Sequence, residues 1–226
     1  MISTFADPLW SRARRLGLGL LLLALPACGL SEYEGLMREK AQKNEEHFRN
    51  EQKYLDEPVQ IPMQKNKEGK DVPLANVFFR PPKGIRTKPD SGPRDDLLWR
   101  YPAVPKSGGD FTYIEMAFAT DDKTFRDNVL NNYRAEESFP TPQRDPPLPF
   151  DTWEFNDSQH GYSINISKGG RTQVAVVYVF GKGRRDALRM AMDLSLQSLA
   201  IDGQAVNARQ KYSQKSPWQL KPTPAP

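Results

Sequence analysis

The sequence TQVAVVYVF, residues 172–180, decides the fold, because apolar side chains occupy both of its faces. Successive side chains of a strand point to opposite faces, so this pattern predicts a central strand that is covered on two sides. Residues 162–167 (YSINIS) alternate instead, with Tyr and Ile expected inward and Ser163, Asn165 and Ser167 outward. Gly169-Gly170 between the two stretches indicates a tight hairpin.

Further strands and helices are expected on both sides of this hairpin. Strands are predicted at residues 111–119 and 152–156, and helices from residue 120 or 121 to about 136 and from about 184 to 200. Residues 75–80 form a short strand candidate, and residues 97–101 fit either a strand or a helical turn. The order predicts an α+β fold, an antiparallel sheet of about four to five strands with two helices packed mainly on one face, preceded by a charged helical stalk.

The N-terminal residues have the composition of a secretory leader. Arg12, Arg14 and Arg15 form a basic segment, and residues 16–25 are almost wholly Leu, Gly and Ala. An apolar run of this length is too short for a membrane-spanning helix, which needs about 20 residues. A basic flank, a short apolar run and a small residue before the cut are typical of a signal peptide.

The end of this leader, Leu25-Pro26-Ala27-Cys28, resembles the lipobox of bacterial lipoproteins. The resemblance covers only the first 28 or so residues, and Pro26 departs from the usual small residue. It implies that residues 1–27 are removed and that Cys28, the first residue of the mature chain, receives a diacylglycerol through its sulfur. Gly29, in place of the aspartate that is associated with inner-membrane retention, favours the outer membrane facing the periplasm. A plain secretory leader or an N-terminal membrane anchor with an incidental cysteine is the alternative.

Composition limits the possible partners. Removing the leader takes away three arginines and one aspartate, so the formal net charge falls from +4 to +2. The basic balance is therefore no argument for nucleic-acid binding, and an exported protein would not meet cytoplasmic nucleic acid. Cys28 is the only cysteine, so an intrachain disulfide is impossible.

The chain is expected to divide into five parts. After the leader, residues 28–55 form the lipidated N-terminus and a charged helical stalk with acidic-to-basic pairs four residues apart. Residues 56–73 form a proline-containing extended linker, residues 74–202 the α+β domain, and residues 203–226 a disordered, proline-rich tail. A weak partner-binding helix is the second interpretation of the stalk.

The final hairpin and helix, residues 162–201, faintly resemble the ending of Mog1/PsbP-type domains. In those domains a hairpin leads into a closing helix that ends in a Ser-Leu-hydrophobic pattern, which is compared here with Ser198-Leu199-Ala200-Ile201. The resemblance covers about a quarter of the chain and implies a non-catalytic accessory or binding domain.

Few residues suggest chemistry. His160 lies in a short polar loop beside Asp157 and Ser158, but neighbours in such a loop usually point apart, and no paired metal-ligand spacing is present. Lys182, Arg184 and Arg185 lie in a glycine-containing turn before a helix, as a possible anion or partner contact. The turn lacks the full P-loop spacing, and solvated arginines on a tight turn are the main interpretation.

The sequence therefore predicts a lipid-anchored envelope protein that acts as a non-catalytic interaction, assembly or accessory module. Its expected partners are the membrane, through Cys28, and an envelope protein; no cofactor or metal is expected. The alternatives are a small-ligand-binding lipoprotein, which needs a sizeable apolar pocket, and a hydrolase that uses carboxylates such as Glu154 and Asp157.

Overall fold

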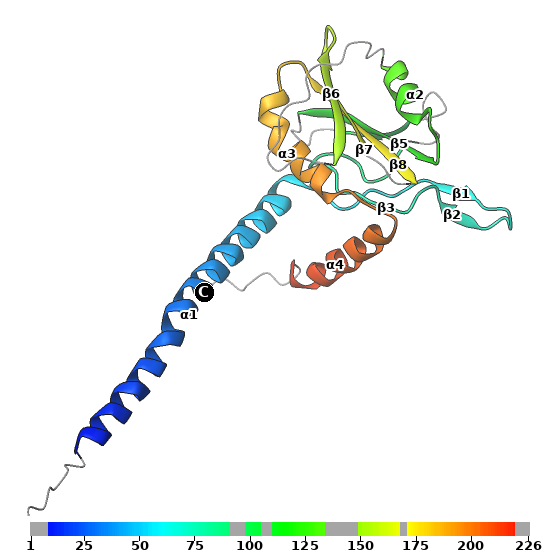
Figure 1. Ribbon diagram of the computed structural model, residues 1–226. Coiled ribbons are helices and arrows are strands. Elements are labelled where there is room, and N and C mark those ends of the chain that lie inside the picture. Colours follow the sequence, from blue (N-terminus) through cyan, green and yellow to red (C-terminus); the bar gives the residue numbers. More distant parts are fainter. Residues whose placement is uncertain (1–8, 91–97, 105–109, 134–148, 168–170, 220–226) are drawn as a thin grey trace, which may run out of the picture. The chain divides into compact units, whose positions relative to one another are not determined.

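The computed structural model describes residues 9–90, 98–104, 110–133, 149–167 and 171–219, with the backbone alone for residues 9–31 and 215–219 (Figure 1). The chain forms two compact units, Met1–Asn50 and Glu51–Pro226. Helix α1, Leu9–Tyr54, makes up the described part of the first unit and ends within the second.

The expected pairs along the charged helix are present. Three ion pairs join residues four apart, Glu34–Arg38 at 3.6 Å, Glu39–Lys43 at 2.7 Å and Glu45–Arg49 at 2.6 Å. All six side chains are more than half exposed, so water screens each pair and the pairs stabilise the helix only slightly. Among the described residues, no helix is both long enough and apolar enough to cross a membrane.

The second unit is built on a five-stranded antiparallel sheet, which confirms the predicted fold class (Figure 1). Its strands run in the order β4-β5-β8-β7-β6. The bounds are Trp99–Pro102 for β4, Phe111–Thr120 for β5, Phe150–Asn156 for β6, His160–Ser167 for β7 and Thr172–Gly181 for β8. The stretch at residues 172–180 is the central strand, as predicted, and is buried on both faces.

The two helices that the sequence placed mainly on one face of the sheet lie on opposite faces. Helix α2, Phe125–Asn132, packs with Ala175, Val177 and Val179, whereas helix α3, Arg185–Ser198, packs with Val174, Val176, Tyr178 and Phe180. The physical reason is β8 itself, because a strand that is apolar on both faces needs a cover on each side.

Two smaller expectations were also wrong. Ser163 and Asn165, expected outward, are fully buried on the α3 face, where Asn165 donates to the Ser163 hydroxyl at 3.1 Å. Helix α2 begins at Phe125 rather than at residue 120 or 121, because Asp121 has a left-handed φ of 54° and the chain turns before the helix starts. The predicted helical residues 134–136 lie outside the described part.

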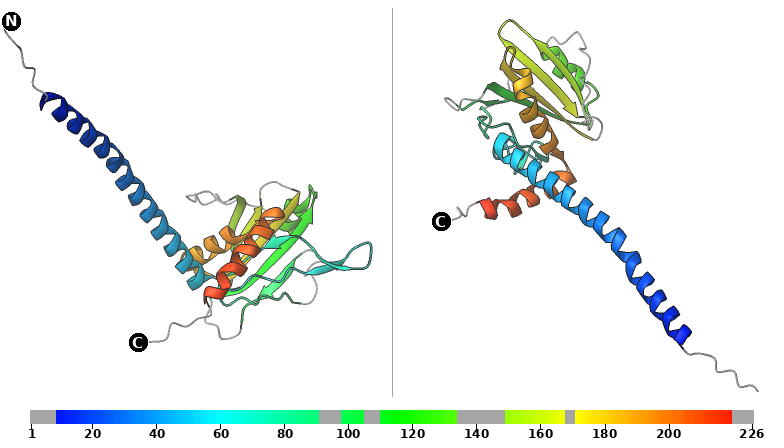
Figure 2. Two further views of the ribbon diagram at one scale, coloured as in Figure 1. Left: turned by 90° about the horizontal axis from the view of Figure 1, so that it is seen from below. Right: turned by 90° about the vertical axis from the view of Figure 1, so that its left-hand side faces the viewer.

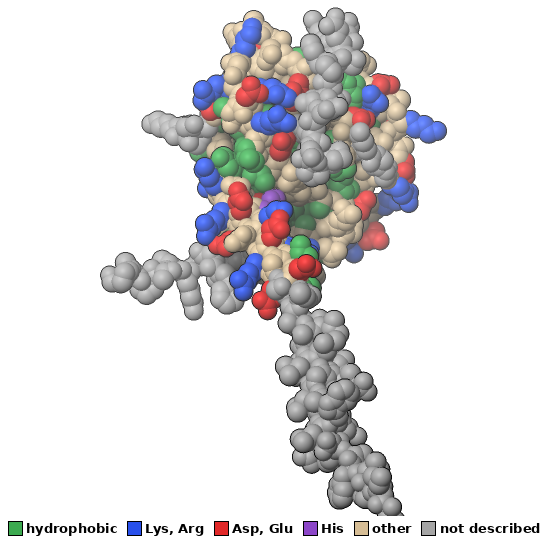
Figure 3. Space-filling model, turned by 60° about the vertical axis from the view of Figure 1, so that its left-hand side comes forward, with side chains coloured by type: hydrophobic (Ala, Val, Ile, Leu, Met, Phe, Trp, Pro, Cys, Tyr) green, Lys and Arg blue, Asp and Glu red, His purple; other side chains and the backbone are tan. Residues whose placement is uncertain are grey.

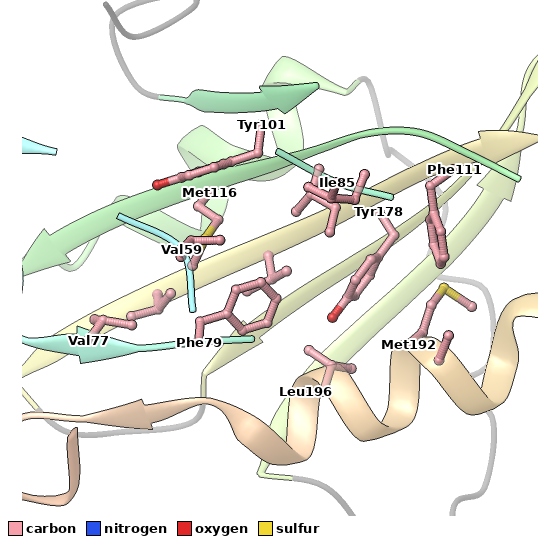
Figure 4. Close-up of a cluster of buried hydrophobic side chains, with 14 of the residues drawn as sticks. Val59, Val77, Phe79, Ile85, Tyr101, Phe111, Met116, Tyr178, Met192 and Leu196 are labelled. Carbon is pink, nitrogen blue, oxygen red and sulfur yellow. The ribbon is translucent and has the colours of Figure 1, made fainter. Parts of the chain in front are cut away.

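Residues 56–73, predicted to be a free linker, belong to the folded unit. They include two short strands, β1 (Met63–Lys65) and β2 (Asp71–Pro73), and lead to β3 (Val77–Phe78). Val59 is buried in the cluster beneath α3, together with Val77, Phe79 and Ile85 (Figure 4). The prolines prevent a regular ladder, but they do not prevent the apolar side chains between them from packing.

Arg80 fastens the beginning of this segment to the core. Its side chain is largely buried, lies 3.2 Å from the Glu51 carboxylate and donates to the Asp56 carbonyl at 3.0 Å. The Ser195 hydroxyl of α3 donates to the Arg80 carbonyl at 2.7 Å. The chain is therefore held from residue 51 onward, well before the predicted start of the domain at residue 74.

Residues 203–219 also differ from the expected disordered tail, and residues 220–226 of that tail lie outside the described part. Helix α3 is followed by strand β9 (Ala200–Ile201), which pairs with β3, and by helix α4 (Gly203–Gln219). Ala205 is fully buried, and the Tyr212 ring lies 5.9 Å from the Phe78 ring. The polar composition concealed this helix because only a few of its side chains make contact.

Candidate functional site

An apolar groove of about 460 Å³ opens between the β1–β2 hairpin, β3 and α4 of the second unit. Val59, Val77 and Phe78 form its buried part, and Met63 at its edge is 58% exposed. The two views in Figure 2 show α4 beside the strands that lead into the hairpin. The volume falls within the range of about 300–1,000 Å³ that is usual for ligand sites.

Hydrogen bonds fix both walls of this groove. The backbone N–H of Val59 donates to the Phe79 carbonyl at 2.9 Å, so the proline-bounded segment lies along the following strand. Arg209 of α4 donates to the Asn76 side chain and to the Val77 carbonyl, both at 2.7 Å. The arginine therefore serves as a clamp that holds α4 in place and shapes the concavity.

Sequence reasoning missed the groove because its walls fall in the predicted linker and the predicted tail. One signal was available. Val59, Ile61 and Met63 alternate along the chain, and this spacing places their side chains on one side of an extended segment.

Two of the three cations of the glycine-containing turn form ion pairs within the protein. Arg184 lies 2.6 Å from the Asp110 carboxylate, and Arg185 of α3 lies 2.5 Å from Glu154 of β6. The hydrogen bond to Glu154 raises the pKa of Arg185 further. Gly183 has a φ of 80°, a left-handed conformation that explains the glycine. Lys182 is exposed. Because Arg184 and Arg185 pair with different carboxylates, the structure does not bring the three predicted cations together on one anion.

One face of the molecule carries mixed rather than purely basic charge. On the face shown in Figure 3, acidic and basic side chains are interspersed. The described part of this face therefore lacks the excess of positive charge that would attract an anionic ligand.

The loop around His160 is a structural turn. The Asp157 carboxylate accepts the backbone N–H groups of His160 and Gln159 at 2.6 and 2.7 Å and the Tyr162 hydroxyl at 2.8 Å. These bonds, led by that from His160, lower the pKa of Asp157 to about 2. The His160 ring is 4.0 Å from the same carboxylate. The hydrogen bonds described for Asp157 therefore hold the turn together and link it to Tyr162 of β7.

Asp157 and Glu154, the pair suggested for a hydrolase, are directed to different sides of the sheet. Glu154 bonds Arg185 on the α3 side, whereas Asp157 bonds Tyr162, whose ring lies 6.0 Å from that of Tyr133 on the α2 side. Two carboxylates that share the work of an acid and a base must face one cleft. The geometry does not supply that arrangement.

A buried ionic cluster, which the sequence did not reveal, lies on the α2 face. The Glu115 side chain is 4% exposed and accepts two bonds from Arg100, at 2.9 and 2.6 Å, and one from the Tyr133 hydroxyl. The Arg100 guanidinium also stacks on the Tyr113 ring, 3.8 Å from its centroid. Burial, and then the nearby Glu115 charge, raise the pKa values of Tyr113 and Tyr133. The available signal was a single glutamate inside the apolar run 113–118.

Cys28 has its backbone within α1, and its side chain lies outside the described side chains. In the part of the chain that the structure describes, no three His, Cys, Asp or Glu residues are grouped so as to hold a metal ion.

Comparison with known proteins gives no family for this chain. No protein-family model matches the sequence, and no curated protein matches it.

Proposed function

We propose that this chain is a lipid-anchored lipoprotein of the bacterial cell envelope, held in the outer membrane and facing the periplasm, and that its second unit is a non-catalytic interaction module. Leu25-Pro26-Ala27-Cys28 supports the anchor. The apolar groove beside α4 is the observation that carries the interaction module, because a protein partner can bury apolar side chains there.

The partner of this groove is an extended protein segment with apolar anchors flanked by acidic residues. The groove is lined mostly by apolar side chains, and the adjoining hairpin carries Lys65, Lys67 and Lys70. Lys70 pairs with Glu68 at 3.2 Å, and Asp71 is the other acidic residue of the hairpin, so the hairpin has a small positive balance. Such charges raise the rate of association with an acidic segment more than they raise its final affinity.

Site-specific photo-crosslinking in cells tests the groove. A crosslinking residue at Met63, at the edge of the groove, is compared with one at Met190, which is 52% exposed on α3 and does not line the groove. The expected result is one envelope protein captured from position 63 and not from position 190.

Matched substitutions then decide whether the contact matters. Met63→Asp should weaken binding of the captured protein at least tenfold, about 1.4 kcal/mol, and Met190→Asp should leave it unchanged. Equal effects of the two substitutions, or equal capture from both positions, would contradict the assignment of the groove.

The anchor is tested separately by metabolic labelling with a lipid probe. Wild-type protein should be labelled and should fractionate with the outer membrane, whereas Cys28→Ala should lose the label. Equal labelling of the two forms would rule out acylation at this residue.

A small-ligand-binding lipoprotein is the second candidate, and the groove volume favours it. Native mass spectrometry of protein purified from the envelope would detect a bound apolar molecule. A ligand that is retained by the wild type and by Met190→Asp but lost from Met63→Asp would establish this alternative.

A further inference from the structure

Three exposed apolar side chains lie close together on helix α1, whose side chains are described from residue 32 onward. Tyr33 is 61% exposed, Leu36 is 65% exposed and Met37 is 50% exposed. At 100° per residue, about 3.6 residues per turn, these three positions fall within an arc of about 100° on one side of the helix. Other exposed large apolar residues of the described chain are spread singly over the second unit.

The stripe spans little more than one turn. Continued along the same side of α1, it meets Lys40, Asn44 and His47. A helix that pairs with a second copy of itself needs apolar residues sustained over three or four heptads, which this side of α1 does not provide. The short stripe instead fits an apolar surface close to Cys28, the first residue of the proposed mature chain.

That surface is the membrane interface, given the position of the stripe relative to Cys28. Tyr33 follows Cys28 by five residues and Met37 by nine, or about 7.5 and 13.5 Å along the helix axis. The polar layer on each side of a bilayer is only about 5–8 Å deep. A helix that rose perpendicular to the membrane would therefore carry Leu36 and Met37 beyond it.

We propose that residues 33–37 of α1 lie obliquely in the interfacial layer of the bilayer next to acylated Cys28, with Tyr33, Leu36 and Met37 facing the lipid. This inference rests on the proposed lipid anchor. Tyrosine is a common side chain at this depth, and Lys40 on the same side can extend its ammonium group into water while its stem follows the lipid.

The contact is apolar rather than electrostatic. Glu34 pairs with Arg38 at 3.6 Å and Glu39 with Lys43 at 2.7 Å, and residues 31–43 carry equal numbers of acidic and basic side chains. Attraction to anionic lipids requires an excess of Lys and Arg. The depth of the stripe should therefore be independent of salt and of the fraction of anionic lipid.

Single thiols placed on the two sides of the helix provide the test. In the acylated full-length protein the sulfur of Cys28 is blocked, so Leu36→Cys carries a unique thiol for an environment-sensitive fluorophore. Gly35→Cys is the matched control, because a Cβ at Gly35 has nothing within 4 Å and Gly35 lies at nearly the same height, about 150° around the helix from the middle of the stripe. Each protein is reconstituted in neutral phosphatidylcholine vesicles, with and without anionic phosphatidylglycerol and at low and high salt.

The expected result is a blue-shifted probe at position 36 that nitroxide lipids quench at least threefold more than the probe at position 35, in all four conditions. Equal quenching at the two positions in lipid-labelled protein would overturn the inference and leave the anchor intact. A disulfide-linked dimer through Leu36→Cys without quenching would also overturn it, in favour of a second copy. Absence of the lipid label from wild-type protein would remove both the anchor and the inference.

Discussion

Removing the positive partner of Glu115 should cost more than removing the negative charge itself. Glu115 is 4% exposed and cannot reach water, whereas Arg100 is 23% exposed and also rests on Tyr113. Breaking a buried ion pair from one side costs about 3–5 kcal/mol, and the partial exposure of Arg100 places Arg100→Met near the lower end, at about 3 kcal/mol. Glu115→Gln removes the charge and keeps an acceptor for Tyr133, at about 1 kcal/mol.

The double variant gives the decisive comparison. In the Arg100→Met background the buried carboxylate loses the neighbouring positive charge of Arg100, and this loss is the main cost, so adding Glu115→Gln should recover about 1 kcal/mol. The same substitution thus destabilises the natural protein and stabilises the variant, with a coupling of about 2 kcal/mol. Urea unfolding of the chain from residue 28 with Cys28→Ser, followed by circular dichroism, measures all four forms.

Two outcomes would refute this reasoning. If the double variant were less stable than Arg100→Met, the carboxylate would not be the source of the cost. If the two single effects simply added, Arg100 and Glu115 would contribute independently, and the short contacts between them would have no energetic meaning.

Three further substitutions test separate features. The pKa of Asp157 is lowered from 3.8 to about 2 in the folded protein, so its ionised carboxylate adds to the free energy of unfolding above pH 4, and this addition is lost as the pH falls toward 2. Asp157→Asn should remove this part of the acid dependence, as measured by urea titrations between pH 2 and 6. Gly161→Ala places a Cβ 2.4 Å from the Phe180 ring, which is 1% exposed, and should lower the free energy of unfolding by about 1–3 kcal/mol. An unchanged urea midpoint would show that the ring moves at little cost. Gly35→Ala on the open side of α1 should stabilise the helix by about 0.5–1 kcal/mol and so increase its helix content slightly. A decrease in the helical ellipticity would contradict the absence of neighbours within 4 Å of this position.

Period-two patterns in the sequence were enough to predict the centre of the sheet. The apolar run at residues 172–180 predicted a doubly covered strand, and β8 is covered on both faces. What failed was the inference from two helices to one covered face, although the pattern of β8 already required two. Local patterns specify which side of an element is apolar, but they do not specify which layer covers it.

The two ends of the folded unit were predicted wrongly for a different reason. Proline density suggested a linker at residues 56–73, and polarity suggested a tail after residue 202. In the folded unit a few side chains, such as Val59, Ala205 and Tyr212, bury these segments while most of their residues stay solvated. Composition averages over a segment, whereas packing depends on single positions. The groove and the Glu115 cluster were missed on the same grounds, since both arise from residues far apart in sequence.

The short pairing of β3 with β9 closes the second unit from both of its ends. Asn76 donates its side-chain amide to the Asp202 carbonyl at 2.8 Å, and the two residues are 126 positions apart in the sequence. Strand β3 therefore cannot pair until β9 has been synthesised, and contacts so distant in sequence make folding slow.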